Sequence, residues 1–339
     1  MKQIKHINVP VFIPHLGCPN MCVFCNQRAI SGVSSFIPDM AQAVIDETLA
    51  TVSQDSECEI AFFGGSFTGI DRELMISLLE LAERYVADGR VCGIRMSTRP
   101  DYIDDEIIGI LRGYTISAVE LGIQSFSEKV LSVSRRGHTT DASRRAMTKL
   151  VDAGFRTVGQ MMIGLPASEL NDEIECASEI CRLGASGSRI YPTIVFRDTE
   201  LYDMTIRGEY KPLSVEEAVE RSAAALDVFV NSGVECLRIG LCDSENLHSD
   251  KAYYAGPNHP ALGELVYGEL YYKRICNKLD SLEPKAGESL IIEIPKGELS
   301  AAIGQKRRNR IRIENKYSVK YVKFIENDNI SRYNIRILK

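Results

Sequence analysis

The sequence has no long apolar run near its start, no internal repeat and no overall positive charge. Residues Met1–Pro10 include charged side chains, so we expect neither a secretory signal nor a membrane span, and we expect a cytoplasmic protein. The net charge of −6 argues against a chain that binds nucleic acid over its whole surface. Hydrophobic residues make up 45% of the 339 residues and charged residues 25%, which is usual for a soluble globular enzyme.

Cysteine, by contrast, is plentiful, with 10 in the chain. A disulfide framework would require a secreted protein, and since we find no secretory signal, the thiols are free to bind metal. Cys18, Cys22 and Cys25 form a C-x₃-C-x₂-C motif. Thiolates at this spacing can hold three corners of a cubane iron–sulfur cluster and leave the fourth iron open to a ligand. The alternatives are a structural zinc loop, with His15 or a distant cysteine as fourth ligand, and buried cysteines without metal.

Short apolar, β-branched runs alternate with helical patterns over the first two-thirds of the chain. Six runs are expected to be strands: Ile7–Ile13, Glu59–Phe63, Gly93–Ser97, Ala118–Ile123, Thr157–Ile163 and Arg189–Val195. Apolar residues at helical spacing lie between them, as in Asp71–Ala87 and Asp141–Ala153. Six strand–helix units predict an α/β fold with a parallel sheet, a partial (βα)6 TIM-type barrel. The cysteine motif directly follows the first strand.

The remaining third predicts a connection and a small second domain. A helix over Ser214–Val230 and a possible strand over Glu235–Leu241 are followed by a loop, Cys242–Pro260, and a helix, Leu262–Leu279. Ser281–Gly287 is expected to be a linker. We therefore predict a barrel domain over residues 1–245, a linker and helix over 246–284, and a basic α+β domain over 285–339.

The cysteine motif, with Phe24 before its last cysteine, resembles the signature of the radical S-adenosylmethionine superfamily. The resemblance extends from about Pro10 to Gly240. It implies a 4Fe–4S cluster whose open iron is chelated by S-adenosylmethionine. An electron from an external donor would cleave this cofactor to a 5′-deoxyadenosyl radical, which would abstract a hydrogen atom from the substrate.

The same resemblance implies cofactor-binding roles for residues that follow the expected strands. Gly64, Gly65 and Ser66 would receive the methionine amino group, and either Glu120 or Gln124 would contact the ribose or the methionine. One of Arg135 and Arg136, with Arg136 preferred, would neutralise the methionine carboxylate. Further candidates are Arg99 as a carboxylate-binding residue and, against the adenine, Gly164 and Leu165.

Each of these assignments has a structural alternative. The glycine pair could form only a tight strand–helix turn, and Arg99 could belong to a surface ion pair. The two arginines, Arg135 and Arg136, could lie at a solvated helix end. An inward-facing Glu120 would be costly unless it is paired, which favours a functional role. The sequence names no residue that acts directly on a substrate.

Several segments resemble the radical domain of the Elongator catalytic subunit family, which modifies wobble uridines in transfer RNA. These segments are Thr98–Tyr102, Glu120–Phe126, Arg135–His138, Arg189–Thr193 and Thr199–Tyr202. Two departures separate the chain from that family. No acetyl-coenzyme A transferase domain is expected after the barrel, and Ala255–Pro260 does not fit the pattern. Oxygen-independent coproporphyrinogen oxidase is a more distant relative, so a porphyrin substrate stays open.

The end of the chain is strongly basic. Lys285–Lys339 contains 13 Lys and Arg against 6 Asp and Glu, a net charge of +7, which leaves −6 − 7 = −13 for the rest of the chain. The expected order is strand Ser289–Pro295, helix Glu298–Ile303, loop, helix Asn309–Lys316, and strands Lys320–Ile325 and Tyr333–Leu338. This order resembles the KH RNA-binding module, which clamps backbone nucleotides on a GxxG loop.

The loop departs from the KH pattern because Arg307 replaces the second glycine of Gly304-Gln305-Lys306-Arg307. The candidate RNA-binding residues are four cations that favour phosphate contacts: Lys306, Arg307, Arg308 and Arg310. The alternative is a degenerate module whose basic face is merely solvated.

These observations predict a radical S-adenosylmethionine enzyme that modifies RNA, with transfer RNA as the candidate substrate. The second hypothesis is a radical enzyme acting on a small molecule or a tetrapyrrole. The third is an RNA-binding protein whose iron–sulfur cluster senses redox state. The glycine pair Gly64-Gly65 and the segment Gly164–Pro166 argue against the third hypothesis, because a sensor needs no cofactor pocket.

Overall fold

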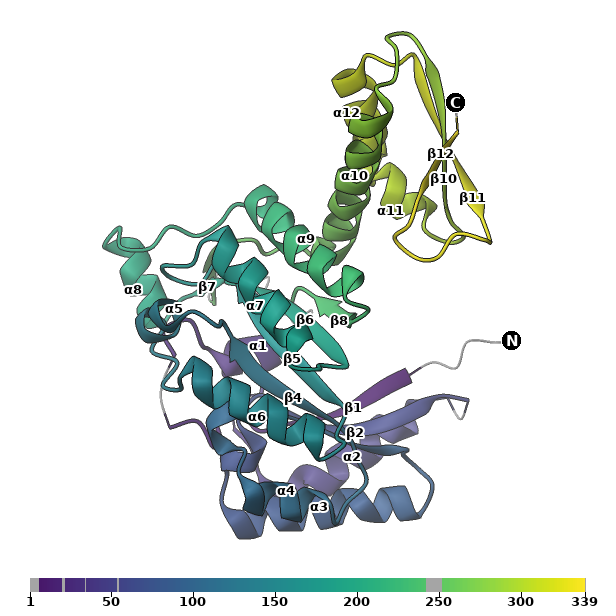
Figure 1. Ribbon diagram of the computed structural model, residues 1–339. Helices are drawn as coiled ribbons and strands as arrows, with labels where there is room; N and C mark the ends of the chain where they lie inside the picture. The colour runs from purple at the N-terminus through teal and green to yellow at the C-terminus, as the bar shows by residue number, and fades with distance from the viewer. Residues whose placement is uncertain (1–5, 20–21, 34, 54, 242–251, 339) are drawn as a thin grey trace.

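The computed structural model describes residues 6–19, 22–33, 35–53, 55–241 and 252–338 (Figure 1). Seven parallel strands form a sheet that curls into a half-barrel, with the order β1-β2-β3-β4-β5-β6-β8. These strands are β1 (His6–Phe12), β2 (Glu57–Phe63), β3 (Gly93–Thr98), β4 (Ile116–Gln124), β5 (Thr157–Ile163), β6 (Gly187–Pro192) and β8 (Glu235–Ile239). The predicted α/β partial barrel is thus confirmed, and β8 adds a seventh strand at one edge.

Helices connect successive strands and cover the outer face of the sheet (Figure 1). These helices are α2 (Ala41–Ala50), α3 (Arg72–Ala87), α4 (Asp105–Leu111), α6 (Thr140–Asp152), α7 (Leu170–Arg182) and α9 (Val215–Asn231). Their starts follow local chemistry, since the side chains of Asp71, Asp104, Thr139 and Ser214 accept backbone N–H hydrogen bonds as N-caps. Short helices α1 (Gln27–Ser31), α5 (Glu128–Val133) and α8 (Glu200–Ile206) lie in the loops.

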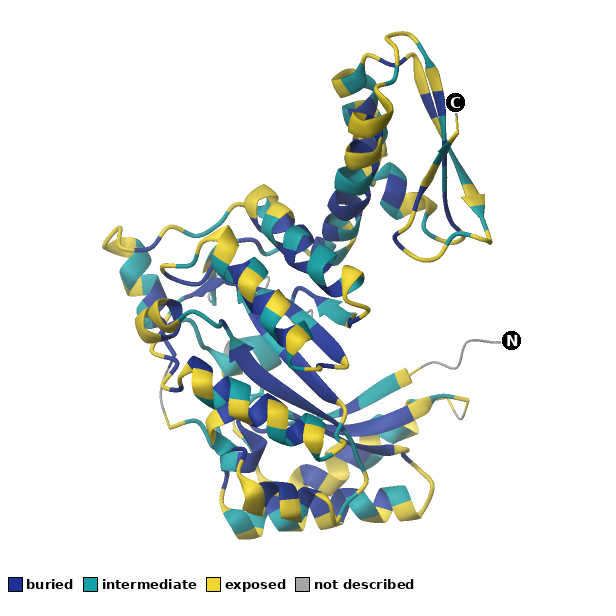
Figure 2. Cartoon of the chain, viewed as in Figure 1, coloured by how far each residue is buried: buried dark blue, intermediate teal, exposed yellow. Residues whose placement is uncertain are grey.

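The main hydrophobic core lies between the sheet and these helices. Figure 2 shows the central strands as the most continuously buried part of the chain, as parallel strands covered by helices should be. In β4, for example, all residues from Ala118 to Ile123 are buried. The sheet therefore gives a rigid frame for the loops that follow its strands.

The region after β6 differs from the prediction. The expected strand Arg189–Val195 ends at Pro192, which has no amide hydrogen to continue the ladder. The chain then forms β7 (Val195–Phe196), which pairs antiparallel with β9 (Tyr253–Ala255). The expected loop Cys242–Pro260 thus contains a short strand, while its residues 242–251 lie outside the described part of the chain.

A small α+β domain ends the chain, as predicted. Its strands β10 (Ser289–Pro295), β11 (Tyr321–Asn327) and β12 (Arg336–Leu338) form a sheet of order β11-β10-β12, with β10 parallel to β11 and antiparallel to β12. The helices are α11 (Leu299–Ile303) and α12 (Arg308–Tyr317). Helix α10 (Leu262–Leu282) precedes the domain, which projects from the barrel on this helix (Figure 1).

Helix α10 is packed against both parts of the molecule. On the barrel side, the Arg274 guanidinium lies 2.7 Å from Asp227 of α9. On the other side, Gly268 accepts a hydrogen bond from the Asn309 side chain at 2.7 Å, and Cys276 accepts one from the Tyr317 hydroxyl at 3.0 Å. The helix is therefore a fixed connection between the two domains. None of the helices in the described ranges is both long and apolar enough to cross a membrane.

Candidate active site

The cysteine motif lies on the loop between β1 and α1, and this loop rests directly on the turn after β2. The Ser66 amide donates to the Leu16 carbonyl at 2.8 Å, and the His15 amide donates to the Gly64 carbonyl at 2.9 Å. Gly17 has a φ of +71°, and a Cβ atom there would lie 2.2 Å from the Ser66 carbonyl oxygen. Only glycine permits this conformation and this close approach, so Gly17 lets this part of the loop pack directly on the turn after β2.

The far side of the loop is anchored by Val23, which is buried. Its amide donates to the carbonyl of Ser134 at 3.1 Å, and its carbonyl accepts from the amide of Leu201 at 2.8 Å. Its side chain packs in a separate apolar cluster with Leu201 and Tyr210. The three cysteines are thus held by contacts to elements far away in the sequence.

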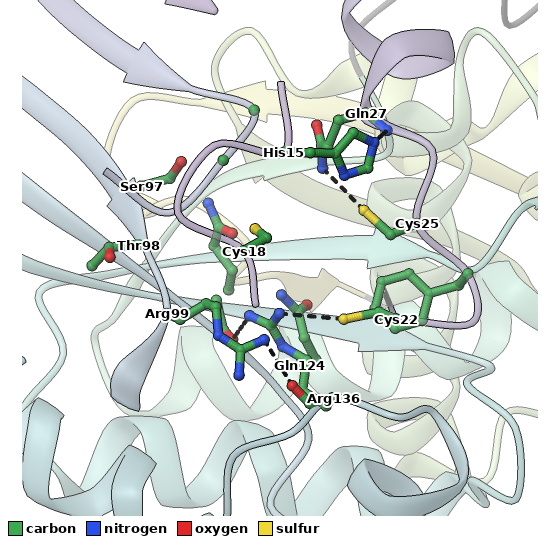
Figure 3. A pocket seen from close by; sticks show the side chains of 15 residues that line it. His15, Cys18, Cys22, Cys25, Gln27, Ser97, Thr98, Arg99, Gln124 and Arg136 are labelled. Carbon is green, nitrogen blue, oxygen red and sulfur yellow. Dashed lines mark hydrogen bonds between the residues drawn. The ribbon is translucent and has the colours of Figure 1, made fainter. Parts of the chain in front are cut away.

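The thiols of Cys18, Cys22 and Cys25 line one cavity of about 110 Å³ (Figure 3). Burial, and after it the neighbouring thiols of Cys22 and Cys18, raise the pKa of Cys25 to about 12. Burial likewise raises the pKa of Cys18. Three thiolates so close together need cations among them, which the irons of a cluster supply.

The single-zinc alternative fits this geometry poorly. The His15 Nε2 atom accepts a hydrogen bond from the Gln27 amide at 3.2 Å, so it is already occupied. Within the described residues, no three His, Cys, Asp or Glu side chains converge closely enough to hold one metal ion. A zinc site needs four ligands around one atom, whereas a cubane spreads its ligands over separate iron corners. The arrangement therefore fits an iron–sulfur cluster.

Arg136 and Gln124 face the cysteines across the cavity (Figure 3). The buried Arg136 guanidinium contacts the Cys22 sulfur at 3.5 Å and the Gly122 carbonyl at 2.6 Å, and its Nε atom has no partner among the described residues. Gln124 has a φ of +70°, a strained conformation for a residue other than glycine, and its Oε1 atom is also buried without a partner there. One free donor and one free acceptor beside the thiols fit a polar ligand bound to the open iron.

Gly122 makes room for these two side chains. A Cβ atom at this position would lie 2.8 Å from the Arg136 Nη2 atom and 3.0 Å from the Gln124 Nε2 atom. The β4–β5 pairing is irregular between Gly122 and Gln124. The end of β4 is thus distorted where it meets the cavity.

Arg99 also lines the cavity, and all three nitrogens of its guanidinium donate to protein oxygens. It is only 2% exposed and binds Asp101 through two hydrogen bonds of 2.9 and 2.8 Å. Its third contact is to the Arg136 carbonyl at 2.7 Å. Arg99 thus forms an ion pair, as the structural alternative supposed, but the pair is buried rather than at the surface, and Arg99 also supports the backbone of Arg136.

His138, which the sequence left without a role, is buried and close enough to Arg136 and Arg99 to be affected by their charges. Neither of its ring nitrogens has a partner among the described residues. Burial, followed by the positive charges of Arg136 and Arg99, lowers its pKa to about 3. The ring is therefore neutral at physiological pH.

Glu120 is buried, does not line the cysteine cavity, and is held by protein donors. Its carboxylate accepts from Arg189 at 2.7 and 2.8 Å, from Arg95 at 3.0 Å and from Gln160 at 2.8 Å. Arg95 also binds Glu59 at 2.7 Å, so two carboxylates and two guanidinium groups neutralise one another. Between the two residues proposed for the same cofactor contact, Gln124 has an open polar atom, whereas the oxygens of Glu120 are occupied.

Ser66, Gly164 and Leu165 do not line the cysteine cavity or the larger cavity beside it. The Ser66 hydroxyl lies 3.0 Å from the Thr98 hydroxyl and accepts from the Arg99 amide at 3.1 Å. The Gly164 amide donates to Glu173 at 2.7 Å, and its carbonyl accepts from a tyrosine hydroxyl. Gly64 and Gly65, by contrast, do line the cysteine cavity.

A second cavity, of about 520 Å³, lies inside the half-barrel next to the first, and we call it the chamber. Residues lining both include Phe24, Cys25, Gly64, Gln124 and Gln160. The chamber also contains side chains that the sequence did not single out: Asn8, Gln160, Met162 and Arg238. Their only sequence signal is their alternate spacing along strands, as in Asn8, Pro10 and Phe12, and alternation cannot tell a cavity from a packed core.

The candidate RNA-binding residues lie together between α11 and the start of α12. Lys306, Arg307 and Arg308 are exposed and have no ion-pair partner in the described part of the chain. Lys306 and Arg307 have φ values of 52° and 64°, the conformation for which glycine is usual. Arg310 differs from them, since it binds Glu314 at 2.9 Å and lies over the Tyr321 ring.

Comparisons with known proteins agree with this geometry. The model of the radical SAM superfamily matches residues 12–176, and the model of the radical SAM C-terminal domain matches residues 185–272. The tRNA uridine(34) acetyltransferase of Methanocaldococcus jannaschii is 28% identical over 60% of this chain and 45% of its own length. The Elongator complex protein 3 of Homo sapiens is 36% identical over 40% of this chain and 25% of its own length. The chain thus spans less than half of these two relatives.

Among solved structures, the Elp3 protein of Methanocaldococcus infernus, with an N-terminal deletion, superimposes with a TM-score of 0.64. The match covers 80% of this chain and 64% of the other at 24% identity. It supports the half-barrel fold described above.

Proposed function

The chain belongs to the radical S-adenosylmethionine superfamily, and we propose that it is a radical enzyme that modifies RNA, with transfer RNA as its substrate. Enzymes of this superfamily use a 4Fe–4S cluster and S-adenosylmethionine. The observation that carries the proposal is the cavity where Cys18, Cys22 and Cys25 face open polar atoms of Arg136 and Gln124, in a chain related to a tRNA uridine(34) acetyltransferase.

When bound, the cluster and its cofactor supply a 5′-deoxyadenosyl radical that removes a hydrogen atom from the substrate. The three cysteines would hold three irons, and Arg136 would stabilise the thiolate of Cys22 through its 3.5 Å contact. The free Nε atom of Arg136 suits the methionine carboxylate, and the free Oε1 atom of Gln124 suits a donor of the cofactor.

The glycine turn after β2 would give the cofactor's amino group access to backbone oxygens, as proposed for Gly64, Gly65 and Ser66. Only the first two line the cavity, so we propose Ser66 as a support for this turn. For Gly164 and Leu165 we keep the proposed position near the adenine, at the end of β5. Burial of the site would exclude water from the reacting atoms.

Further proposals concern the electron donor, the cellular location, the domain division and the RNA-binding role of the basic domain. We propose an external electron donor for the cluster, and the cytoplasm as the location, because free thiols persist there. We propose the division into residues 1–245, 246–284 and 285–339, with α10 as the connection between the barrel and the basic domain. The basic domain would bind transfer RNA through its exposed loop cations, as a KH-like module.

The test is anaerobic incubation of reconstituted, reduced protein with S-adenosylmethionine, with and without transfer RNA. We expect 5′-deoxyadenosine in both reactions, more of it with transfer RNA, and a new nucleoside in digests of that RNA. No 5′-deoxyadenosine above the level of a Cys22→Ala variant would contradict the enzyme assignment. Formation of 5′-deoxyadenosine that transfer RNA neither increases nor redirects would contradict the RNA proposal alone.

A small-molecule substrate is the second candidate, and one observation favours it. The chamber of about 520 Å³ lies within the usual size range of small-molecule sites, roughly 300–1,000 Å³. In that case small substrates, tetrapyrroles included, would raise 5′-deoxyadenosine formation where transfer RNA does not.

A further inference from the structure

We propose that Arg238 binds an oxyanion of the substrate, a phosphate or a carboxylate, at the open edge of the half-barrel. The inference rests on the proposed function only in treating the chamber as the substrate site.

Arg238 lies on β8, at the opposite edge of the sheet from β1. The chamber is lined by residues of both edge strands, Asn8 and Phe12 from β1 and Arg238 from β8. In a closed barrel, further strands would join the two edge strands. Because this sheet is open, a cavity lined by both edge strands extends to the gap between them. A substrate that is too large to enter the chamber entirely can therefore insert one group and leave its charged part beside Arg238.

The Arg238 side chain is held in place by backbone oxygens that lie close in sequence. Its Nε atom donates to the Gly240 carbonyl at 3.1 Å, and its Nη2 atom donates to the Leu241 carbonyl at 2.8 Å. These contacts leave the Nη1 hydrogens and one Nη2 hydrogen for another acceptor. No carboxylate pairs with Arg238 among the residues that the structure describes.

Arg189 on β6 lies opposite Arg238 in the register of the β6–β8 pair. Unlike Arg238, it forms an ion pair with a carboxylate. Its charge is balanced by Glu120, which together with Glu59 neutralises Arg95 and Arg189. Among the described residues, the charged side chains of Arg, Lys, Asp and Glu that line the chamber are Arg189, Glu120 and Arg238. Within this set, the positive charge of Arg238 has no carboxylate to balance it.

A half-buried guanidinium held in a fixed orientation is a strong site for an oxyanion, because it offers two donors in one plane. Across the chamber, the buried Oδ1 atom of Asn8 has no partner among the described residues. A ligand with both an oxyanion and an N–H donor would satisfy the two sites, and a uridine nucleotide has both groups.

The experiment measures binding of three probes to cluster-reconstituted full-length protein by isothermal titration calorimetry. The probes are uridine 5′-monophosphate, uridine and succinate. The variants are Arg238→Gln, Arg238→Lys and the control Arg156→Gln, whose exposed guanidinium lies outside the chamber and 3.4 Å from Glu235. Melting temperatures of all variants verify that each is folded.

We expect Arg238→Gln to weaken binding of the monophosphate by about 10- to 100-fold, as loss of a charge-assisted hydrogen bond should. Arg238→Lys should retain part of the affinity, Arg156→Gln all of it, and uridine should bind wild type and Arg238→Gln equally. The same pattern with succinate in place of the nucleotide would support the role of Arg238 while removing support for an RNA substrate. If Arg238→Gln binds the two anionic probes as well as wild type does, or if wild type binds neither, the proposal is wrong.

Discussion

Three arginines of the barrel and the loop cations of the basic terminal domain differ in how their positive charges are balanced. In the barrel, the guanidinium groups of Arg95, Arg99 and Arg189 are largely buried, and each lies within 3.0 Å of a carboxylate. In the terminal domain, Lys306 and Arg307 are exposed and have no ion-pair partner in the described residues. The interaction energy of charges in a low-dielectric interior depends strongly on the exact position of each partner. The effect of exposed charges depends mainly on how many there are, and salt screens it. The difference indicates that the two regions should fail in different ways when mutated.

The largest effect is expected at the cysteines. A Cys22→Ala variant should lose the cluster and all formation of 5′-deoxyadenosine, because two thiolates cannot hold the remaining irons. Iron content and the electron paramagnetic resonance signal of the reduced protein, with and without S-adenosylmethionine, measure this loss. The control is Cys92→Ala, since Cys92 is exposed and outside the cavity. A spectrum that does not respond to S-adenosylmethionine in wild type would contradict the open iron.

The next largest effect is expected for Glu120→Gln. This change removes one charge from a buried network and leaves Arg189 without its carboxylate, which costs about 3–5 kcal/mol of folding free energy. Urea unfolding measures it. The control is Asp328→Asn, whose exposed pair with Lys296 should be worth only about 0–1 kcal/mol.

The same variant tests the role first proposed for Glu120 from the sequence. If Glu120 contacts the cofactor, the variant should bind S-adenosylmethionine more weakly while its stability stays close to that of wild type. Loss of stability without loss of cofactor affinity would leave Gln124 as the better candidate.

A smaller effect, with a different signature, is expected for the loop cations. The triple variant with Lys306, Arg307 and Arg308 changed to Ala should bind transfer RNA more weakly and reduce the slope of log affinity against log salt by about 2–3. Stability should hardly change, because these side chains are exposed. The matched control changes Lys285, Lys320 and Lys323 to Ala, which removes the same charge from other exposed positions of the domain. Equal effects of the two triple variants would mean that the domain offers only diffuse positive charge.

Local sequence patterns were sufficient for much of the fold. The strands Thr157–Ile163 and Ser289–Pro295 have the bounds that their apolar runs predicted. The cysteine motif was equally accessible, because its three ligands lie within eight residues of one another. Strand β9 was missed because three residues between turn-forming neighbours give no periodic signal.

The rest of the site depends on contacts between residues far apart in the sequence. Arg189 reaches Glu120 across 69 positions, and Arg136 reaches Cys22 across 114. A sequence can show that Glu120 would need a partner, but it does not show which residue supplies it. The burial of Arg99 was likewise hidden, because an arginine at a strand end is equally compatible with the surface. The cofactor roles of all these residues stay predictions.

Near neutral pH the smallest effect is expected for His138, which lies on the barrel side of the comparison. Since the folded protein holds the pKa of this histidine at about 3, below its usual value of about 6.5, the unfolded chain binds a proton more readily. Stability should therefore fall as the pH decreases from about 6.5 toward 3, by up to about 1.4 kcal/mol per pH unit from this group.

In a His138→Phe variant this component of the slope should vanish between pH 6.5 and 4, which urea midpoints at several pH values measure against wild type. A His259→Gln variant serves as the control, because His259 lies outside both cavities and accepts a hydrogen bond from the Ala261 amide. An unchanged slope in His138→Phe would mean that the pKa of His138 is the same in the folded and the unfolded chain. In that case neither burial nor the positive charges of Arg136 and Arg99 would lower the pKa of this ring. The expected difference between buried and exposed charges would then lack support at this residue.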